Sequence, residues 1–148
     1  MKKIILTVLI LVVLTSCKKT SLSGDHFIFG SSYSECGGNC VNYFIIKKDQ
    51  LYPDDMTNAL DKLRFKNQKL SQDKYNLAKQ LIDKLPDYLK NSSSSTFGCP
   101  DCRDQGAYYI EIKENSKINK FHIDTDTSQI PPEIKSYILD LKSILGQL

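Results

Sequence analysis

Four cysteines in two closely spaced pairs are the residues of this chain best suited to do chemistry. Cys36 and Cys40 enclose Gly-Gly-Asn, and Cys99 and Cys102 enclose Pro-Asp. Because Gly, Asn, Pro and Asp are turn formers, each pair is predicted to lie in a turn at the entrance of a strand, where the fold can bring both pairs to one end of a sheet. Disulfide bonds, a four-cysteine zinc site and a redox-active dithiol all fit this pattern.

The N-terminal stretch predicts that the chain is exported. Two lysines precede an apolar run at residues 4–14, which has the length of a signal peptide and is well short of the roughly 20 residues that span a membrane. The Leu-Thr-Ser-Cys that closes the stretch resembles a bacterial lipobox, which implies acylation of Cys17. We therefore predict three parts: a lipoprotein signal peptide at 1–16, a lipidated tether at 17–25 and a single domain at 26–148.

The predicted anchor places the protein in the cell envelope. Stable attachment to a membrane needs more than one acyl chain, which the multiply acylated cysteine of lipoproteins would supply. No aspartate follows Cys17, and by resemblance to lipoprotein sorting in enteric bacteria this favours the outer membrane over the inner one. We expect the folded domain to face the periplasm or the cell surface.

Location also favours one of the three cysteine chemistries. Once Cys17 is assigned to lipid, four of the five cysteines remain, and an even number in an oxidising compartment is typical of disulfides, within or across the pairs. The Cys-Pro-Asp-Cys turn resembles half a zinc knuckle, but Arg103 replaces the glycine usual after its second cysteine. A dithiol of the thioredoxin kind needs a helix after the pair, whereas a strand is expected here. Disulfides are therefore predicted, their connectivity is left open, and no cofactor is expected.

The charge of the chain argues against nucleic acid as a partner. The formal net charge is +3, and removal of Lys2 and Lys3 with the signal leaves 3 minus 2, or +1. A nearly neutral chain without a basic cluster lacks the electrostatic footprint of a nucleic-acid-binding protein. The expected partners are the membrane, through the lipid anchor, and a protein or glycan of the envelope.

Hydrophobic periodicity predicts an α+β fold. Strands are expected at 26–33, 41–47, 107–113 and 117–124, the last two as a hairpin, and a short element at 51–52; residues 60–65 are ambiguous and favour a strand. Helices are expected from Ser71 to about Leu85, where Pro86 either ends the helix or begins one further turn, and from Pro131 or Pro132 to the end. The prediction is an antiparallel sheet of about four to five strands with two main helices on one face.

No catalytic constellation is recognisable in the sequence. Gly-x-Ser-x-Gly, His-Glu-x-x-His and a glycine-rich phosphate loop are all missing, and a cysteine paired with His122 is the weakest of the alternatives. Asp124 and Asp126 begin like a calcium loop, but Gln129 and Lys135 stand where glycine and glutamate are required. These acidic residues are therefore interpreted as a solvent-exposed face that leads into a helix.

A binding surface is expected near the cysteine turns. Five tyrosines fall on or beside predicted strands, where aromatic side chains either fill the core or form a recognition surface. The residues singled out for such a surface are Tyr33, Asp101 and Arg103. If the domain only binds or supports a partner, we expect oxidised, metal-free cysteines and no cleft with perturbed titratable groups.

Three stretches, together with the lipobox, resemble uncharacterised lipoproteins of Bacteroidota. They are SECGGNCVNYFIIKKDQLY, KYNLAKQLIDKLP and FGCPDCRDQGAYYIEI, and the Cys-Pro-Asp-Cys turn is the most specific element. The resemblance implies an envelope location and a small α+β domain, and it implies no activity. The acidic run that marks surface export in that phylum is missing here. The sequence thus predicts a non-catalytic, disulfide-stapled envelope lipoprotein, with a zinc or thiol redox protein as the alternative.

Overall fold

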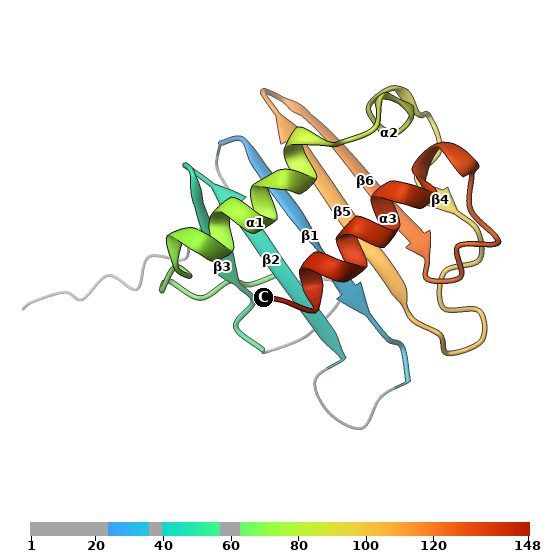
Figure 1. Cartoon of the computed structure of the whole chain (residues 1–148), viewed down its shortest axis with the longest axis horizontal. Helices are drawn as coiled ribbons and strands as arrows, with labels where there is room; N and C mark the ends of the chain where they lie inside the picture. The colour runs from blue at the N-terminus through green and yellow to red at the C-terminus, as the bar shows by residue number, and fades with distance from the viewer. Residues whose placement is uncertain (1–23, 36–39, 57–62) are drawn as a thin grey trace, which may run out of the picture.

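The computed structural model, which describes residues 24–35, 40–56 and 63–148, is an α+β fold built on one sheet (Figure 1). The strand order is β3-β2-β1-β5-β6-β4, and every neighbouring pair is antiparallel except β4 and β6. The strands are β1 His26–Ser32, β2 Val41–Lys47, β3 Gln50–Pro53, β4 Thr96–Phe97, β5 Ala107–Glu114 and β6 Lys117–Asp124. The helices are α1 Gln72–Asp83, α2 Asp87–Asn91 and α3 Pro132–Leu145.

Local turn chemistry explains the two short hairpins. Lys48 and Asp49 join β2 to β3 and have φ values of 49° and 54°, which suits a two-residue hairpin loop. Asn115, with a φ of 56°, begins the equally short connection between β5 and β6. Asparagine and aspartate tolerate this left-handed conformation better than most side chains do. The hairpin predicted from residues 107–124 is confirmed.

The helices begin and end close to the predicted residues. Ser71 is the N-cap of α1, and its Oγ accepts a hydrogen bond from Lys74 N at 3.4 Å. Pro86 is the N-cap of α2, so the proline separates two helices. The predicted apolar face of α3 is buried: Ile134, Tyr137, Ile138, Leu141 and Ile144.

Two features of the predicted architecture need correction. The sheet has six strands among the described residues, because residues 95–97, for which no strand was expected, run along β6: His122 N donates to Ser95 O at 2.8 Å, and β4 pairs with β6. Three helices, not two, contribute to the core, since Leu89 of α2 is fully buried there. Of the ambiguous segment 60–65, residues 60–62 lie outside the described residues, and Phe65 forms an isolated antiparallel bridge with Asp54.

The two faces of the sheet are covered differently. Helices α1 and α3 lie across one face (Figure 1), which we call the helix-covered face, and pack on side chains that alternate along the strands, among them Phe27, Phe29, Ile110, Phe121 and Ile123. The opposite, helix-free face carries a smaller apolar cluster of Ile28, Val41, Tyr43, Ile45 and Tyr109, against which Leu63 and Phe65 pack. The helix-covered face is thus filled by the main core, whereas among the described residues the helix-free face carries only the smaller cluster.

Candidate functional site

Two of the four predicted cysteines form a local disulfide. Cys99 and Cys102 are bonded, with their Cα atoms 5.5 Å apart, inside the range usual for disulfides. Cys40 is also disulfide-bonded, whereas Cys36 and the predicted lipid site Cys17 lie outside the described residues. The predicted disulfide chemistry is confirmed for Cys99 and Cys102, while the four-cysteine zinc site stays an untested prediction.

Asp101 connects the Cys99–Cys102 turn by a hydrogen bond to Ser34, just beyond the end of β1. Its φ is 59°, and its carboxylate accepts hydrogen bonds from Ser34 N at 2.7 Å and Gly106 N at 2.9 Å. Tyr33 N donates to Cys40 O at 2.8 Å on the same side of this junction. Cys40 and the Cys99–Cys102 turn therefore lie at the same end of the sheet, whereas residues 36–39 of the first turn lie outside the described residues. Hydrogen bonds from Ser34 and Gly106 hold the pKa of Asp101 below its ordinary value, so this carboxyl is ionised at neutral pH.

The three residues predicted to form one surface, Tyr33, Asp101 and Arg103, lie in two separate places in the structure. The Tyr33 ring, 43% exposed, lies against Gly106, where an added Cβ would come within 2.5 Å of it, and so is next to the Asp101 junction. Arg103 instead lines a separate hollow of about 380 Å³ together with Cys99, Cys102 and Asp126. Asp101 and Arg103, which are two positions apart in one turn, therefore line different hollows, which the sequence spacing does not reveal.

A hollow of about 410 Å³ opens on the helix-free face. We call it the ring hollow; it is lined by Ser32, Tyr43, Leu63, Pro100, Asp101, Ala107, Tyr109, Lys120 and His122. Three of these are rings in contact: Tyr43 and Tyr109 have centroids 5.5 Å apart, and Tyr109 and His122 have centroids 5.2 Å apart. The ring of His122 is exposed, whereas both tyrosines are buried and form the floor.

One glycine makes this row of rings possible. Gly30 on β1 pairs with Tyr43 on one side and Tyr109 on the other, and Tyr109 pairs with His122. Tyr43 and Tyr109 thus belong to strands about 9–10 Å apart, with β1 between them. A Cβ on Gly30 would lie 2.4 Å from Tyr43 Cδ1 and 2.2 Å from Asn42 O. The missing side chain lets the Tyr43 ring reach across β1 toward Tyr109.

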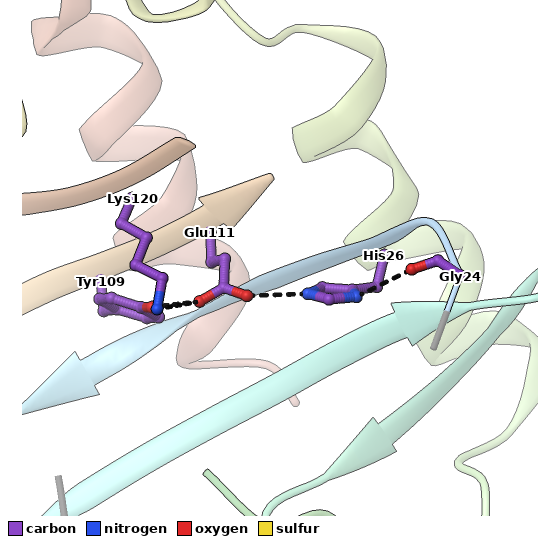
Figure 2. A network of polar contacts seen from close by, with 5 residues as sticks. All are labelled: Gly24, His26, Tyr109, Glu111 and Lys120. Carbon is purple, nitrogen blue, oxygen red and sulfur yellow. Dashed lines mark hydrogen bonds and ion pairs between the residues drawn. The ribbon is translucent and has the colours of Figure 1, made fainter. Parts of the chain in front are cut away.

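A buried polar network lies beside the ring hollow on the same face (Figure 2). Glu111 accepts hydrogen bonds from His26 Nε2 at 2.8 Å and from Tyr109 Oη at 2.5 Å, and Lys120 Nζ lies 3.3 Å from its Oε2. His26 Nδ1 is 3.3 Å from Gly24 O. His26 and Glu111 are only 8% and 5% exposed. Neither residue was expected to have a role from the sequence, although a glutamate among the apolar residues of β5 was a signal of an inward-facing charge.

The network keeps Glu111 ionised in spite of its burial. Burial by itself would raise the pKa of Glu111, but hydrogen bonds from Tyr109 and His26, together with the charge of Lys120, outweigh it and lower the pKa. Burial, together with the same carboxylate, raises the pKa of Tyr109 far above its ordinary value. Tyr109 therefore stays protonated and donates its hydrogen bond to Glu111 at all physiological pH values.

The titratable rings of the ring hollow are biased toward their uncharged forms. Burial raises the pKa of Tyr43, and burial together with nearby Lys120 lowers the pKa of His122. The ring hollow is therefore a cleft with perturbed titratable groups, which was not expected for a domain that only binds a partner. Yet burial, which disfavours charge, is the main cause of these shifts. Such shifts make the rings a neutral contact surface at neutral pH.

The pair that resembled the start of a calcium loop has a structural role. Asp124 is only 1% exposed, and its carboxylate accepts hydrogen bonds from Cys99 N at 2.9 Å and Asp126 N at 2.8 Å. The interpretation of a solvent-exposed face is wrong for Asp124, since its strand ends directly beneath the disulfide turn. Within the described part of the chain, no three His, Cys, Asp or Glu side chains are placed to hold a metal ion.

The described helices are all too short or too polar to cross a bilayer. No protein-family model matches the chain, and a search of curated proteins finds no significant match. The fold and site therefore define a class only: an α+β protein with one helix-covered sheet face and a ring-lined hollow on the other.

Proposed function

We propose that this protein is a lipid-anchored lipoprotein of the cell envelope whose domain binds a ligand in the ring hollow without transforming it. The observation that carries the binding role is the ring hollow itself. It is a concave site of about 410 Å³, a size typical of small-ligand sites. Its residues are held in place by the sheet, by the Cys99–Cys102 turn and by the Glu111 network.

The side chains of the ring hollow favour binding over catalysis. A nucleophile needs an adjacent base, and a general acid or base works best with a pKa near the working pH. Both tyrosine pKa values lie above the ordinary value and that of His122 lies below it. The carboxylate of Asp101 already accepts two backbone hydrogen bonds. Such groups orient a ligand and have no reactive partner among the described lining residues.

The envelope location is supported by the N-terminal stretch and by the cysteines. The apolar run and the Leu-Thr-Ser-Cys sequence resemble a lipoprotein signal, and Cys17 is the proposed acylation site. The disulfide between Cys99 and Cys102 fits an oxidising compartment, since cytosolic thiols are kept reduced. The resemblance to Bacteroidota lipoproteins points the same way, with the outer membrane favoured.

A thiol redox function is the second candidate, favoured by one observation. Both sulfur-bearing residues of the Cys99–Cys102 bridge are exposed, so an external dithiol could reach them. Against it, no helix begins at Cys99, where a dipole would stabilise a thiolate; a turn precedes β5 instead. The four-cysteine zinc alternative requires this same bridge to be reduced, since two of the four thiolates are used in it.

Two measurements on the protein from its own envelope test the proposal. An alkyne-palmitate probe fed to growing cells should label the wild type and leave a Cys17→Ser variant unlabelled. Intact mass before and after reduction, with metal analysis, should show four cysteines in two disulfides and no bound zinc. An unlabelled wild type would contradict the anchor. Zinc in stoichiometric amount or free thiols would favour the alternative function.

A further inference from the structure

We propose that the ring hollow binds an uncharged, hydroxyl-rich ring, that is, a neutral sugar unit of a glycan. The proposal rests on the binding function proposed above and names the ligand class for that site. It follows from the charges, the hydrogen-bonding groups and the apolar surfaces that converge on the hollow.

The charges that face the hollow disfavour charged ligands. Asp101 lies in the wall of the hollow and is ionised. The Glu111 carboxylate lies beside the hollow, and its exposed partner is Lys120. An anion would meet the Asp101 carboxylate, and a cation would meet the Lys120 ammonium. Both would also lose hydration in a partly enclosed site. Since the rings of Tyr43, Tyr109 and His122 are neutral, the hollow offers no net charge of either sign to a ligand.

The polar groups of the hollow favour hydroxyls over groups with a fixed hydrogen-bonding role. Asp101 can only accept and Lys120 can only donate, whereas neutral His122 and the Ser32 hydroxyl can each do both. About four acceptor positions are expected on a carboxylate, and Asp101 uses two of them for Ser34 N and Gly106 N. A sugar hydroxyl both donates and accepts, so neighbouring hydroxyls can satisfy acceptor and donor groups in one ring.

The remaining lining suits the C–H faces of the same ring. Leu63, Pro100 and Ala107 are apolar, and the exposed imidazole of His122 is backed by the Tyr109 ring at 5.2 Å. Apolar and aromatic surfaces beside a few fixed polar groups are the usual composition of a small-ligand site. A flat amphipathic ring matches this lining better than an extended peptide, whose amides alternate between donors and acceptors along a line.

The experiment uses the chain's two histidines as separate reporters. The lipidated protein in detergent micelles, with labelled histidines, is titrated with glucose and N-acetylglucosamine, and in parallel with glucuronate, glucosamine and trialanine. We expect the neutral sugars to move the His122 ring signals more than those of His26, which is buried in the polar network. The charged sugars and trialanine should have weaker effects at His122.

Calorimetric affinities of variants locate the site. We expect Asp101→Asn and His122→Ala to bind the responding neutral sugar about tenfold more weakly, because each loses a hydrogen bond or a contact to the ligand. Arg103→Gln is the matched control, since Arg103 belongs to the same turn but lines the other hollow; its affinity should stay within about twofold. Lys120→Met covers the case in which Asp101→Asn disturbs the turn.

The outcomes separate this proposal from the proposed function. An absent His122 response to every neutral sugar, or an equal loss of affinity in Arg103→Gln, would overturn the ligand class. A His122 response to trialanine or to a charged sugar alone would also overturn it, while leaving a binding role for the hollow. Palmitate labelling and cysteine oxidation depend on neither result and test the anchor and the disulfides of the proposed function, whereas its binding role would fail if no compound, neutral or charged, moved the His122 signals.

Discussion

The helix-covered and helix-free faces are built from the same strands but carry different kinds of side chain. Alternate residues of β5 illustrate it: Tyr108, Ile110 and Ile112 pack under the helices, whereas Tyr109 and Glu111 lie on the other face. One face buries apolar surface against helices and provides most of the core. The other buries an ionised carboxylate and two tyrosine rings beneath an exposed histidine. The difference separates the main apolar core from the polar network and the ring hollow, where we propose that a ligand binds.

The largest effect is expected from a cavity in the helix-covered face. Phe29 is fully buried and stacks between Phe27 and Phe44. Phe29→Ala should lower the free energy of unfolding by about 3–5 kcal/mol, the sum of lost burial and an unfilled cavity. Urea unfolding followed by circular dichroism measures it. Ile118→Ala on β6, 48% exposed, is the control and should cost less than about 0.5 kcal/mol. Similar costs for the two variants would remove the distinction between the faces.

Removal of the buried carboxylate on the helix-free face should have the next largest effect. Glu111→Leu leaves His26 and Tyr109 without their partner and should cost about 2–3 kcal/mol in unfolding free energy. Adding His26→Leu should recover part of this loss, because an apolar pair replaces the polar pair. Glu114→Leu, at the exposed end of the same strand, is the control. Additive costs in the double variant would argue that the network is not a coupled unit.

The disulfide should contribute less to stability and more to local order. Cys99→Ser combined with Cys102→Ser opens a very small loop, so the unfolding free energy should fall by at most about 2 kcal/mol. The amides of Ser34 and Gly106, which donate to Asp101, should exchange hydrogen faster. The Asn115 amide, which donates to Asp25 elsewhere in the fold, should be unchanged. Equal acceleration at all three amides would indicate global loosening rather than a local role.

The smallest expected effect is the pH dependence of the His122 ring. Because burial and Lys120 lower the pKa of His122, its ring signal should titrate below the ordinary value of 6.5. The folded state then binds fewer protons there than the unfolded state, so this group's contribution to stability is present above pH 6.5 and is lost as the pH falls through the lower folded value. Lys120→Met should raise the titration midpoint, and Lys117→Met should leave it in place. A midpoint above 6.5 would contradict the neutral-ring interpretation.

Elements with a strong local signal were predictable from the sequence. The Ser71 cap, the prolines before α2 and α3 and the apolar spacing of α3 depend on neighbours within a few residues of one another. The turn formers between Cys99 and Cys102 predicted a turn there for the same reason, and residues 100–103 form one. β4 was missed because two residues, Thr96 and Phe97, join the sheet only through pairing with β6, and a serine-rich stretch carries no strand pattern.

The site could be predicted only in part. Asp101 was singled out for its place between two cysteines, and it does line the ring hollow. Arg103 was grouped with it because the two are neighbours in sequence, but a turn with a left-handed residue at 101 sends the two side chains apart. Asp124 was taken for a surface residue, since a carboxylate at the end of a strand gives no sign that a turn 25 residues away will bury it.

The amino-acid sequence by itself determined the local elements, the turn chemistry around the cysteines and the lipoprotein-like N-terminus, because these depend on residue types a few positions apart. The tertiary structure alone decided that His26 meets Glu111 across 85 residues and that Tyr43, Tyr109 and His122 form one row. The physical reason is strand order: side chains on different strands become neighbours only when long-range pairing places β2, β1, β5 and β6 side by side in one register.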